Sequence, residues 1–179
     1  MKNKFFNMIV GVFEDKPYSN IAEIGTHKAG SAKQFVWLLA PRANKLHYTG
    51  YDVFDSVKDS EGLRKKERNG KSTPTIEQAK YELDRLKNRF KNFDYTLHQG
   101  LTSDTLLSPI EFDFVYIDGG HSYETVKHDY LMVSKSKLII FDDANLPGVK
   151  RFLEELSATT EINYIVDKKR IWGIIRNEV

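Results

Sequence analysis

Short apolar runs alternate with segments of helical period from residue 20 to residue 176. The runs that favour strands cover residues 21–24, 46–54, 93–97, 112–117, 138–141, 162–166 and 171–176. This alternation predicts right-handed βαβ units, and therefore a doubly wound α/β fold with helices on both faces of a sheet. The run over residues 138–141 is apolar at every position, which is typical of a central parallel strand.

Apolar residues spaced three and four apart predict the helices between these strands. Ser31 and Gln34 match a capping box, which predicts that the first helix begins there. The other predicted helices follow Pro74 and cover residues 123–133 and 149–156. The last two strands flank a turn over residues 167–169, so we expect them to form a hairpin.

The length of 179 residues predicts a single domain over residues 1–179, because domains usually hold about 100–200 residues. Residues 1–19 are expected to form a helical N-terminal extension. The apolar residues between Phe5 and Phe13 recur at helical spacing, but this run is far shorter than the ~20 residues of a membrane-spanning helix. It also lacks a small-residue cleavage site, so we expect no secretory signal, no membrane partner and a cytoplasmic location.

Charge and cysteine content narrow the partners and cofactors. The chain has 27 Lys and Arg against 25 Asp and Glu. Because this charge is nearly balanced, we do not expect the protein to bind nucleic acid. It contains no cysteine, which excludes disulfides, thiolate zinc sites and iron–sulfur clusters. A polar insert over residues 56–73 holds six basic and three acidic residues. This insert could be a lid over a substrate, a contact for an acidic substrate, or a solvated loop.

Ligands of a doubly wound sheet bind outside the carboxyl ends of its strands, so residues just after each strand are the candidate site residues. Glycines at positions 25 and 30 follow the first strand and allow a tight turn with close ligand approach. This segment lacks the G-x-G-x-x-G and Walker patterns, and an ordinary strand-to-helix turn would fit it equally well. Asp52 ends the second strand, where an acid can accept both hydroxyls of a ribose. Asp55 lies further from the strand end and is the weaker candidate.

Three more carboxylates follow the fourth and fifth strands, namely Asp118, Asp142 and Asp143. Neighbouring strands lie ~4.8 Å apart, so these side chains could converge on one point. Converging carboxylates repel each other, which favours a shared proton or a hard cation such as Mg²⁺. Alternatively, these residues cap turns or bind backbone amides, or a basic residue from elsewhere neutralises them.

Taken together, these residues resemble the class I S-adenosylmethionine-dependent methyltransferases. Within that class the chain is similar to the small O-methyltransferase-like group, family 24, which carries an I-D-G-x-H-S-Y signature here found at residues 117–123. The resemblance covers roughly residues 20–176 and implies a Rossmann-like, mostly parallel sheet of seven strands with an antiparallel C-terminal strand. It implies S-adenosylmethionine as cofactor. The cofactor-binding residues that it implies are Glu23, Gly25, Thr26, Gly30, Asp52, Gln99, Ser103 and Asp118. For Ser103, and for the neighbouring Thr102, the alternative is a helix cap.

A second resemblance, to metal-dependent catechol-type O-methyltransferases, concerns the catalytic residues. Asp118, Asp142 and Asp143 fall on the metal positions of that group, and His121 falls where it has a lysine base. The chain departs from the pattern in having His for Lys and a second Asp for Asn. The resemblance implies methyl transfer to a hydroxyl of a small molecule or sugar. His121 would take the proton, and Asp118 would help to orient the acceptor through a bound Mg²⁺.

Other functions stay open at this point. The chain could be a metal-independent methyltransferase acting on nitrogen or on a macromolecule, or a nucleotide-binding module without activity. His121 could simply fix its loop by a hydrogen bond to the backbone. The sequence also leaves open whether a second copy of the chain completes the pocket as a homo-oligomer.

Overall fold

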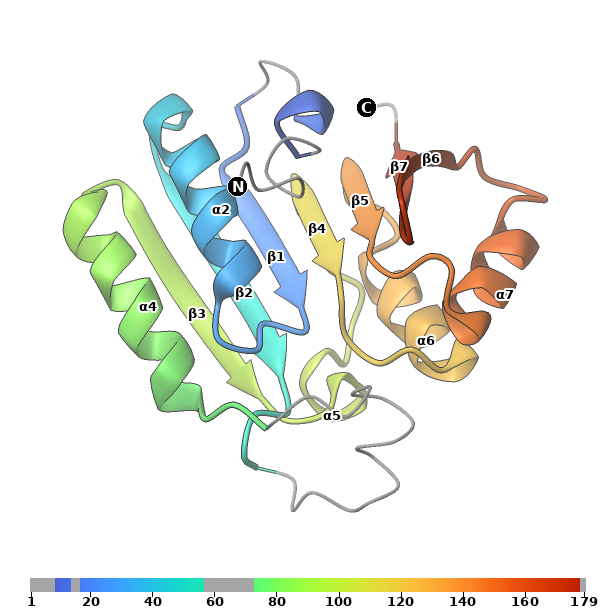
Figure 1. Cartoon of the computed structure of the whole chain (residues 1–179). Coiled ribbons are helices and arrows are strands. Elements are labelled where there is room, and N and C mark those ends of the chain that lie inside the picture. The colour runs from blue at the N-terminus through green and yellow to red at the C-terminus, as the bar shows by residue number, and fades with distance from the viewer. Residues whose placement is uncertain (1–8, 14–16, 57–72, 178–179) are drawn as a thin grey trace.

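The computed structural model of the chain describes residues 9–13, 17–56 and 73–177 (Figure 1). The polar insert over residues 56–73, for which a lid was one of three interpretations, therefore lies almost entirely outside the described residues. Of the expected N-terminal extension, residues 9–12 are helical, and Ile9 and Phe13 are fully buried. The ring of Phe13 packs edge-on against Phe114, with ring centroids 4.7 Å apart. This segment thus docks on the core through its apolar side chains.

Seven strands form one sheet in the order β3-β2-β1-β4-β5-β7-β6. Their bounds are β1 (Asn20–Ile24), β2 (Leu46–Asp52), β3 (Phe93–Gln99), β4 (Phe114–Ile117), β5 (Leu138–Phe141), β6 (Asn163–Asp167) and β7 (Arg170–Arg176). Strands β1 to β5 pair in parallel, whereas β7 is antiparallel to both β5 and β6. The predicted sheet, including its antiparallel C-terminal strand, is confirmed. The strand order reverses between β1 and β4, which is where ligands of such sheets bind.

Helices cover both faces of this sheet, as Figure 1 shows. Their bounds are α2 (Gly30–Leu39), η1 (Ala40–Arg42), α4 (Ile76–Arg89), α5 (Thr102–Thr105), α6 (Tyr123–Val133) and α7 (Pro147–Leu156). Helices α2 and α4 bury their apolar side chains in one core cluster, and α6 and α7 bury theirs in a second cluster on the other face. The β strands between the two clusters are covered on both sides, which explains why β4 and β5 are buried at every position.

Helix α4 begins with a complete capping box, in which Gln78 N–H donates to Thr75 Oγ1 and Thr75 N–H donates to Gln78 Oε1, each at 3.3 Å. The capping box predicted for Ser31 and Gln34 is wrong. Helix α2 instead follows Ala29, whose backbone lies in the left-handed region, and it has no side-chain cap. The tight turn after β1 decides this start, and it leaves the first turn of α2 facing the carboxyl end of the sheet. Helix α5 also lacks a side-chain cap, so the alternative of a capping Thr102 or Ser103 is not observed.

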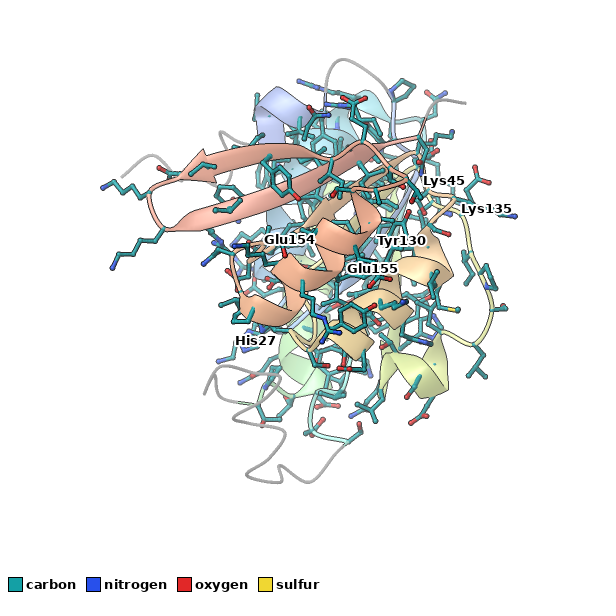
Figure 2. All side chains as sticks on the ribbon, turned by 90° about the vertical axis from the view of Figure 1, so that its right-hand side faces the viewer. His27, Lys45, Tyr130, Lys135, Glu154 and Glu155 are labelled. Atoms are coloured by element: carbon teal, nitrogen blue, oxygen red, sulfur yellow. The ribbon has the colours of Figure 1, made fainter. Side chains whose placement is uncertain are left out.

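Helices α6 and α7 pack against each other through aromatic rings and a charged pair at the rim. The rings of Tyr130 and Phe152 lie 5.5 Å apart, and Lys127 Nζ lies 2.9 Å from Glu155 Oε1. Figure 2 shows Glu155 on α7 and Tyr130 on α6 on the same side of the molecule. The buried rings hold the two helices together, because an exposed ion pair contributes little to stability.

Candidate functional site

A cavity of about 450 Å³ opens at the carboxyl ends of β1, β2 and β4, at the point where the strand order reverses. Among the predicted site residues, the ones that line it are Glu23, Gly25, Thr26, Gly30, Asp52, Asp118 and His121. Gln99 and Ser103 do not line it. Gln99 Nε2 donates to Asp55 at 2.9 Å, and Ser103 Oγ donates to Asp104 at 3.2 Å. Their neighbours Gly100, Leu101 and Thr102 line the cavity instead.

The turn after β1 presses directly on the end of β4. Gly25 has φ of +95°, and a Cβ at this position would lie 2.0 Å from the carbonyl oxygen of Asp118. Asp118 N–H donates to the carbonyl of Ile24 at 2.8 Å, and Gly25 N–H donates to the carbonyl of Tyr51, also at 2.8 Å. Only glycine fits this backbone and this spacing. The glycine that the sequence singles out for close approach therefore approaches another segment of the chain.

Asp52 is held by backbone amides on both of its carboxylate oxygens. Its Oδ2 accepts from His27 N–H at 2.8 Å, and its Oδ1 accepts from Phe54 N–H at 2.7 Å. Both donor residues have positive φ, +49° for His27 and +44° for Phe54, which turns their amides toward the carboxylate. Each oxygen keeps further acceptor capacity. The carboxylate at the cavity wall can therefore accept two neighbouring hydroxyls of a ribose.

Glu23 forms a buried polar floor under this site. Its side chain accepts from Tyr48 O–H at 2.6 Å, and Tyr48 in turn lies 3.1 Å from Thr26 Oγ1. Burial raises the pKa of Glu23 well above its usual value, and the charges of Asp118 and Asp52 act in the same direction, whereas the hydrogen bond from Tyr48 opposes the rise. Glu23 thus holds a proton to higher pH than an exposed glutamate.

This raised pKa predicts how Glu23→Gln changes stability with pH. The folded state binds the Glu23 proton more tightly than the unfolded state, so its stabilising effect is complete below the unfolded pKa of ~4.3 and is lost as pH rises through the folded pKa. Glutamine removes the ionisation and can still accept from Tyr48. We expect the variant to gain about 1.4 kcal/mol over wild type for each pH unit of that window, in urea unfolding followed from pH 4 upward. A difference that stays constant with pH would contradict the raised pKa.

The loop after β4 is fixed from two sides. Ser122 begins α6 as its N-cap, and its Oγ accepts from Thr125 N–H at 3.3 Å. Gly148, in the first turn of α7, packs against the loop so closely that a Cβ there would lie 2.2 Å from the carbonyl oxygen of His121. Close packing of α7 therefore fixes the backbone of His121 at the edge of the cavity.

Asp118, His121 and Asp143 come together at the ends of β4 and β5. One ligand atom from each of these residues lies within 4.8 Å of the other two, and His121 Nε2 lies 3.5 Å from Asp143 Oδ2. All three side chains are partly buried. The arrangement pairs an imidazole with a carboxylate beside the cavity, which suits the histidine to accept a proton.

Asp142 departs from the expectation that it joins this cluster. Its carboxylate is fully buried and accepts from Tyr116 O–H at 2.7 Å and from Arg170 Nε at 2.9 Å, with a second, closer bond from the Arg170 guanidinium. It also accepts from the N–H of Asp143 at 2.8 Å. In the parts of the chain that are described, the group of possible metal ligands therefore contains His121 in place of Asp142.

Two residues of the site escaped the sequence analysis. Arg170 is the first residue of β7, one position before the predicted start of that strand, and the antiparallel register places it beside the end of β5. Asp129, a fully buried residue of α6, lines the cavity together with Thr125 one helical turn earlier. The signal for Asp129 was available, since a carboxylate on the apolar face of a predicted helix is unusual.

Comparisons with known proteins agree with this geometry. The family 24 model described as "Methyltransferase domain" matches residues 22–143. No match is found among curated proteins. Within the described residues, every helix is too short or too polar to span a membrane.

Several solved structures share the fold of this chain. The O-methyltransferase TomG from Streptomyces achromogenes, solved in complex with SAM, is 17% identical with a TM-score of 0.57, over 98% of this chain and 79% of that one. Precorrin-6y C5,15-methyltransferase from Geobacter metallireducens is 12% identical with a TM-score of 0.60, over 97% and 86%. The ribosomal protein L11 methylase from Lactobacillus delbrueckii is 14% identical with a TM-score of 0.56, over 98% and 78%. At these identities the likeness shows a common fold.

Proposed function

The chain belongs to the family of S-adenosylmethionine-dependent methyltransferase domains, and from this premise we propose that it methylates a hydroxyl oxygen of a small molecule or sugar. The observation that carries the proposal is the pairing of His121 with Asp143, 3.5 Å apart, beside a cavity of cofactor size. A hydroxyl must lose its proton as it is methylated, and an imidazole oriented by a carboxylate is a suitable acceptor.

The cavity offers a place for the ribose, the amino-acid part and the methyl group of the cofactor. Its volume of about 450 Å³ falls in the usual range for small-molecule sites. Asp52 would accept the ribose hydroxyls, and the turn that contains Gly25, Thr26 and Gly30 would contact the amino-acid part. Asp118 reaches both this cavity and the cluster with His121, so it would lie between the methyl donor and the acceptor.

In the proposed reaction, the acceptor oxygen attacks the methyl carbon in line with the carbon–sulfur bond. As the new carbon–oxygen bond forms, the carbon–sulfur electron pair returns to sulfur, and S-adenosylhomocysteine is the second product. His121 takes the hydroxyl proton. Alignment of donor and acceptor would supply most of the acceleration, because the protein forms no covalent intermediate.

The expected Mg²⁺ site of Asp118, Asp142 and Asp143 does not fit the side chains as they lie. Mg²⁺ prefers six oxygen ligands in near-octahedral geometry, and the fork of Arg170 already occupies both oxygens of Asp142. A cation bound to His121 would also disfavour a second positive charge on the same imidazole, so the histidine would be a poorer proton acceptor. The proposed reaction therefore uses His121 and Asp143 without a step through a metal.

Calorimetric titration with S-adenosylhomocysteine tests the cofactor assignment. Wild type should bind one equivalent, and Asp52→Ala should bind about 10- to 100-fold more weakly, because hydrogen bonds to a charged group are each worth ~1.5–3 kcal/mol. Asp55→Ala is the matched control, since Asp55 is an exposed neighbour that bonds Gln99 outside the cavity. Equal weakening in both variants, or binding of NAD in place of S-adenosylhomocysteine, would contradict the assignment.

Transfer of labelled methyl groups tests the acceptor class. The enzyme is incubated with S-adenosylmethionine labelled in the methyl group and with matched pairs of hydroxyl and amino compounds, such as sugars and amino sugars. The proposal expects label on oxygen. Label found only on nitrogen would leave the family assignment intact and overturn the choice of oxygen.

A further inference from the structure

Arg170 lies where the sequence analysis expects a metal ion to act. It begins β7, and the antiparallel register with β5 brings it past the end of that strand, next to Asp142. Its guanidinium donates through two nitrogens to the two oxygens of Asp142. This two-pronged contact is the geometry in which arginine binds carboxylates most strongly. One acid of the expected metal site is thus already neutralised by the chain itself.

The influence of Arg170 extends beyond Asp142 to the acids of the cluster. Partial burial opposes a charged guanidinium, yet the hydrogen bond and charge of Asp142, with a smaller effect of the charge of Asp118, raise the pKa of Arg170. Asp118 belongs to the group formed with His121 and Asp143. The positive charge of Arg170 therefore acts mainly on Asp142, just after β5, and more weakly on Asp118, just after β4. In the remaining group of possible metal ligands, Asp118, His121 and Asp143, His121 is the proposed proton acceptor, and a cation bound to it would disfavour a second positive charge on its ring.

Arginine and a metal ion exclude each other at Asp142. A cation that bound this carboxylate would have to displace the guanidinium and would then lie beside it. Arg170 is about half exposed, but Asp142 is fully buried, so removing the guanidinium is costly because the carboxylate charge would stay uncompensated. Tyr116 O–H and Asp143 N–H complete the shell of Asp142, so its oxygens are satisfied without a metal.

We propose that Arg170 is the resident cation of this site and makes methyl transfer independent of a divalent metal ion. This inference rests on the proposed function, since it concerns the same reaction. Arg170 is a positioning residue, because it acts on the cluster only through its bonds to Asp142. Its bonds also hold Asp142 outside the cluster. Asp143 is then the carboxylate that pairs with His121, and His121 is the proton acceptor.

Manganese binding tests the proposal without relying on activity. Titration of Mn²⁺ followed by electron paramagnetic resonance should show no stoichiometric binding to wild type with S-adenosylhomocysteine present. Arg170→Met removes the guanidinium and frees the carboxylate of Asp142, so this variant should bind one Mn²⁺. Its melting temperature should then rise by about 5–10 °C at Mn²⁺ about 100-fold above the Kd. Lys169→Met, one residue earlier in the same turn, should behave as wild type.

A double variant and an assay with a chelator complete the experiment. Adding Asp142→Asn to Arg170→Met should abolish the acquired binding, and methyl transfer by wild type should persist in EDTA. Stoichiometric Mn²⁺ binding to wild type would overturn the proposal, and so would activity that EDTA removes and Mn²⁺ restores. A folded Arg170→Met variant without Mn²⁺ binding would also overturn it. If that variant does not fold, the wild-type titration and the EDTA assay decide. If wild type does not bind S-adenosylhomocysteine, this result would instead contradict the proposed function.

Discussion

Replacing His121 with asparagine is expected to lower kcat for methyl transfer by about 100- to 10,000-fold, the usual contribution of general acid–base catalysis. Asparagine keeps hydrogen-bonding capacity near Asp143 but cannot take the proton of the acceptor. The affinity for S-adenosylhomocysteine should stay close to that of wild type, because Asp52 and the turn at Gly25 are unchanged. Steady-state kinetics and calorimetry on the same preparations measure both quantities.

The pH profile distinguishes a proton acceptor from a residue that only fixes the loop. Only unprotonated imidazole accepts a proton, so kcat of wild type should rise with pH to a plateau, and this rise should be lost in His121→Asn. His47→Asn is the control. His47 is the second residue of β2, at the end of the strands opposite the cavity, where its Nε2 lies 3.1 Å from Thr96 Oγ1. A His121 variant with wild-type kcat and an unchanged profile would show that the histidine has the structural role.

Gly25→Ala is expected to destabilise the protein by about 3–5 kcal/mol, a large part of the ~5–15 kcal/mol that holds a typical domain folded. Alanine pays for the left-handed backbone at φ of +95°, and its Cβ would overlap the carbonyl oxygen of Asp118 at 2.0 Å. The end of β4 cannot yield easily, because the N–H of Asp118 is bonded to Ile24. Urea unfolding monitored by circular dichroism gives the change in the free energy of unfolding.

Gly30→Ala provides the matched control for stability. A Cβ at Gly30 would meet no atom within 4 Å, and this glycine begins α2. Alanine there should be neutral or should stabilise by about 0.5–1 kcal/mol, because it reduces the freedom of the unfolded chain. If both variants lose stability equally, the close contact between Gly25 and Asp118 is not the cause of the destabilisation.

The sheet could be predicted from the sequence because each strand is marked by its own run of apolar residues. The residues at which the strands end were harder to predict, because they depend on contacts with other segments. The second strand was expected to reach Phe54 but ends at Asp52, since Asp52 turns its carboxylate back to the N–H of Phe54. The third strand extends two residues beyond the predicted Leu97, because it pairs with β2 as far as Asp52. A local side-chain hydrogen bond and the pairing of neighbouring strands therefore decided where these strands end.

The candidate site was predictable where one residue follows one strand and less so where charges from distant segments meet. Asp52 and Asp118 line the cavity as strand-end residues should. The partner of Asp142 was not predictable in the same way, because Arg170 lies 28 residues later and reaches it only through the antiparallel pairing of β7. Local spacing carries no information about such a pairing until the register is known.

The tight contact between Gly25 and Asp118 also bears on how such a domain can acquire new substrates during evolution. The turn that would hold the methyl donor and the strand end that leads to His121 touch through main-chain atoms. The spacing between donor and base is thus inherited with the backbone. Side chains around the mouth of the cavity can then vary, and new acceptors can be selected, while the distance between the methyl donor and His121 stays the same.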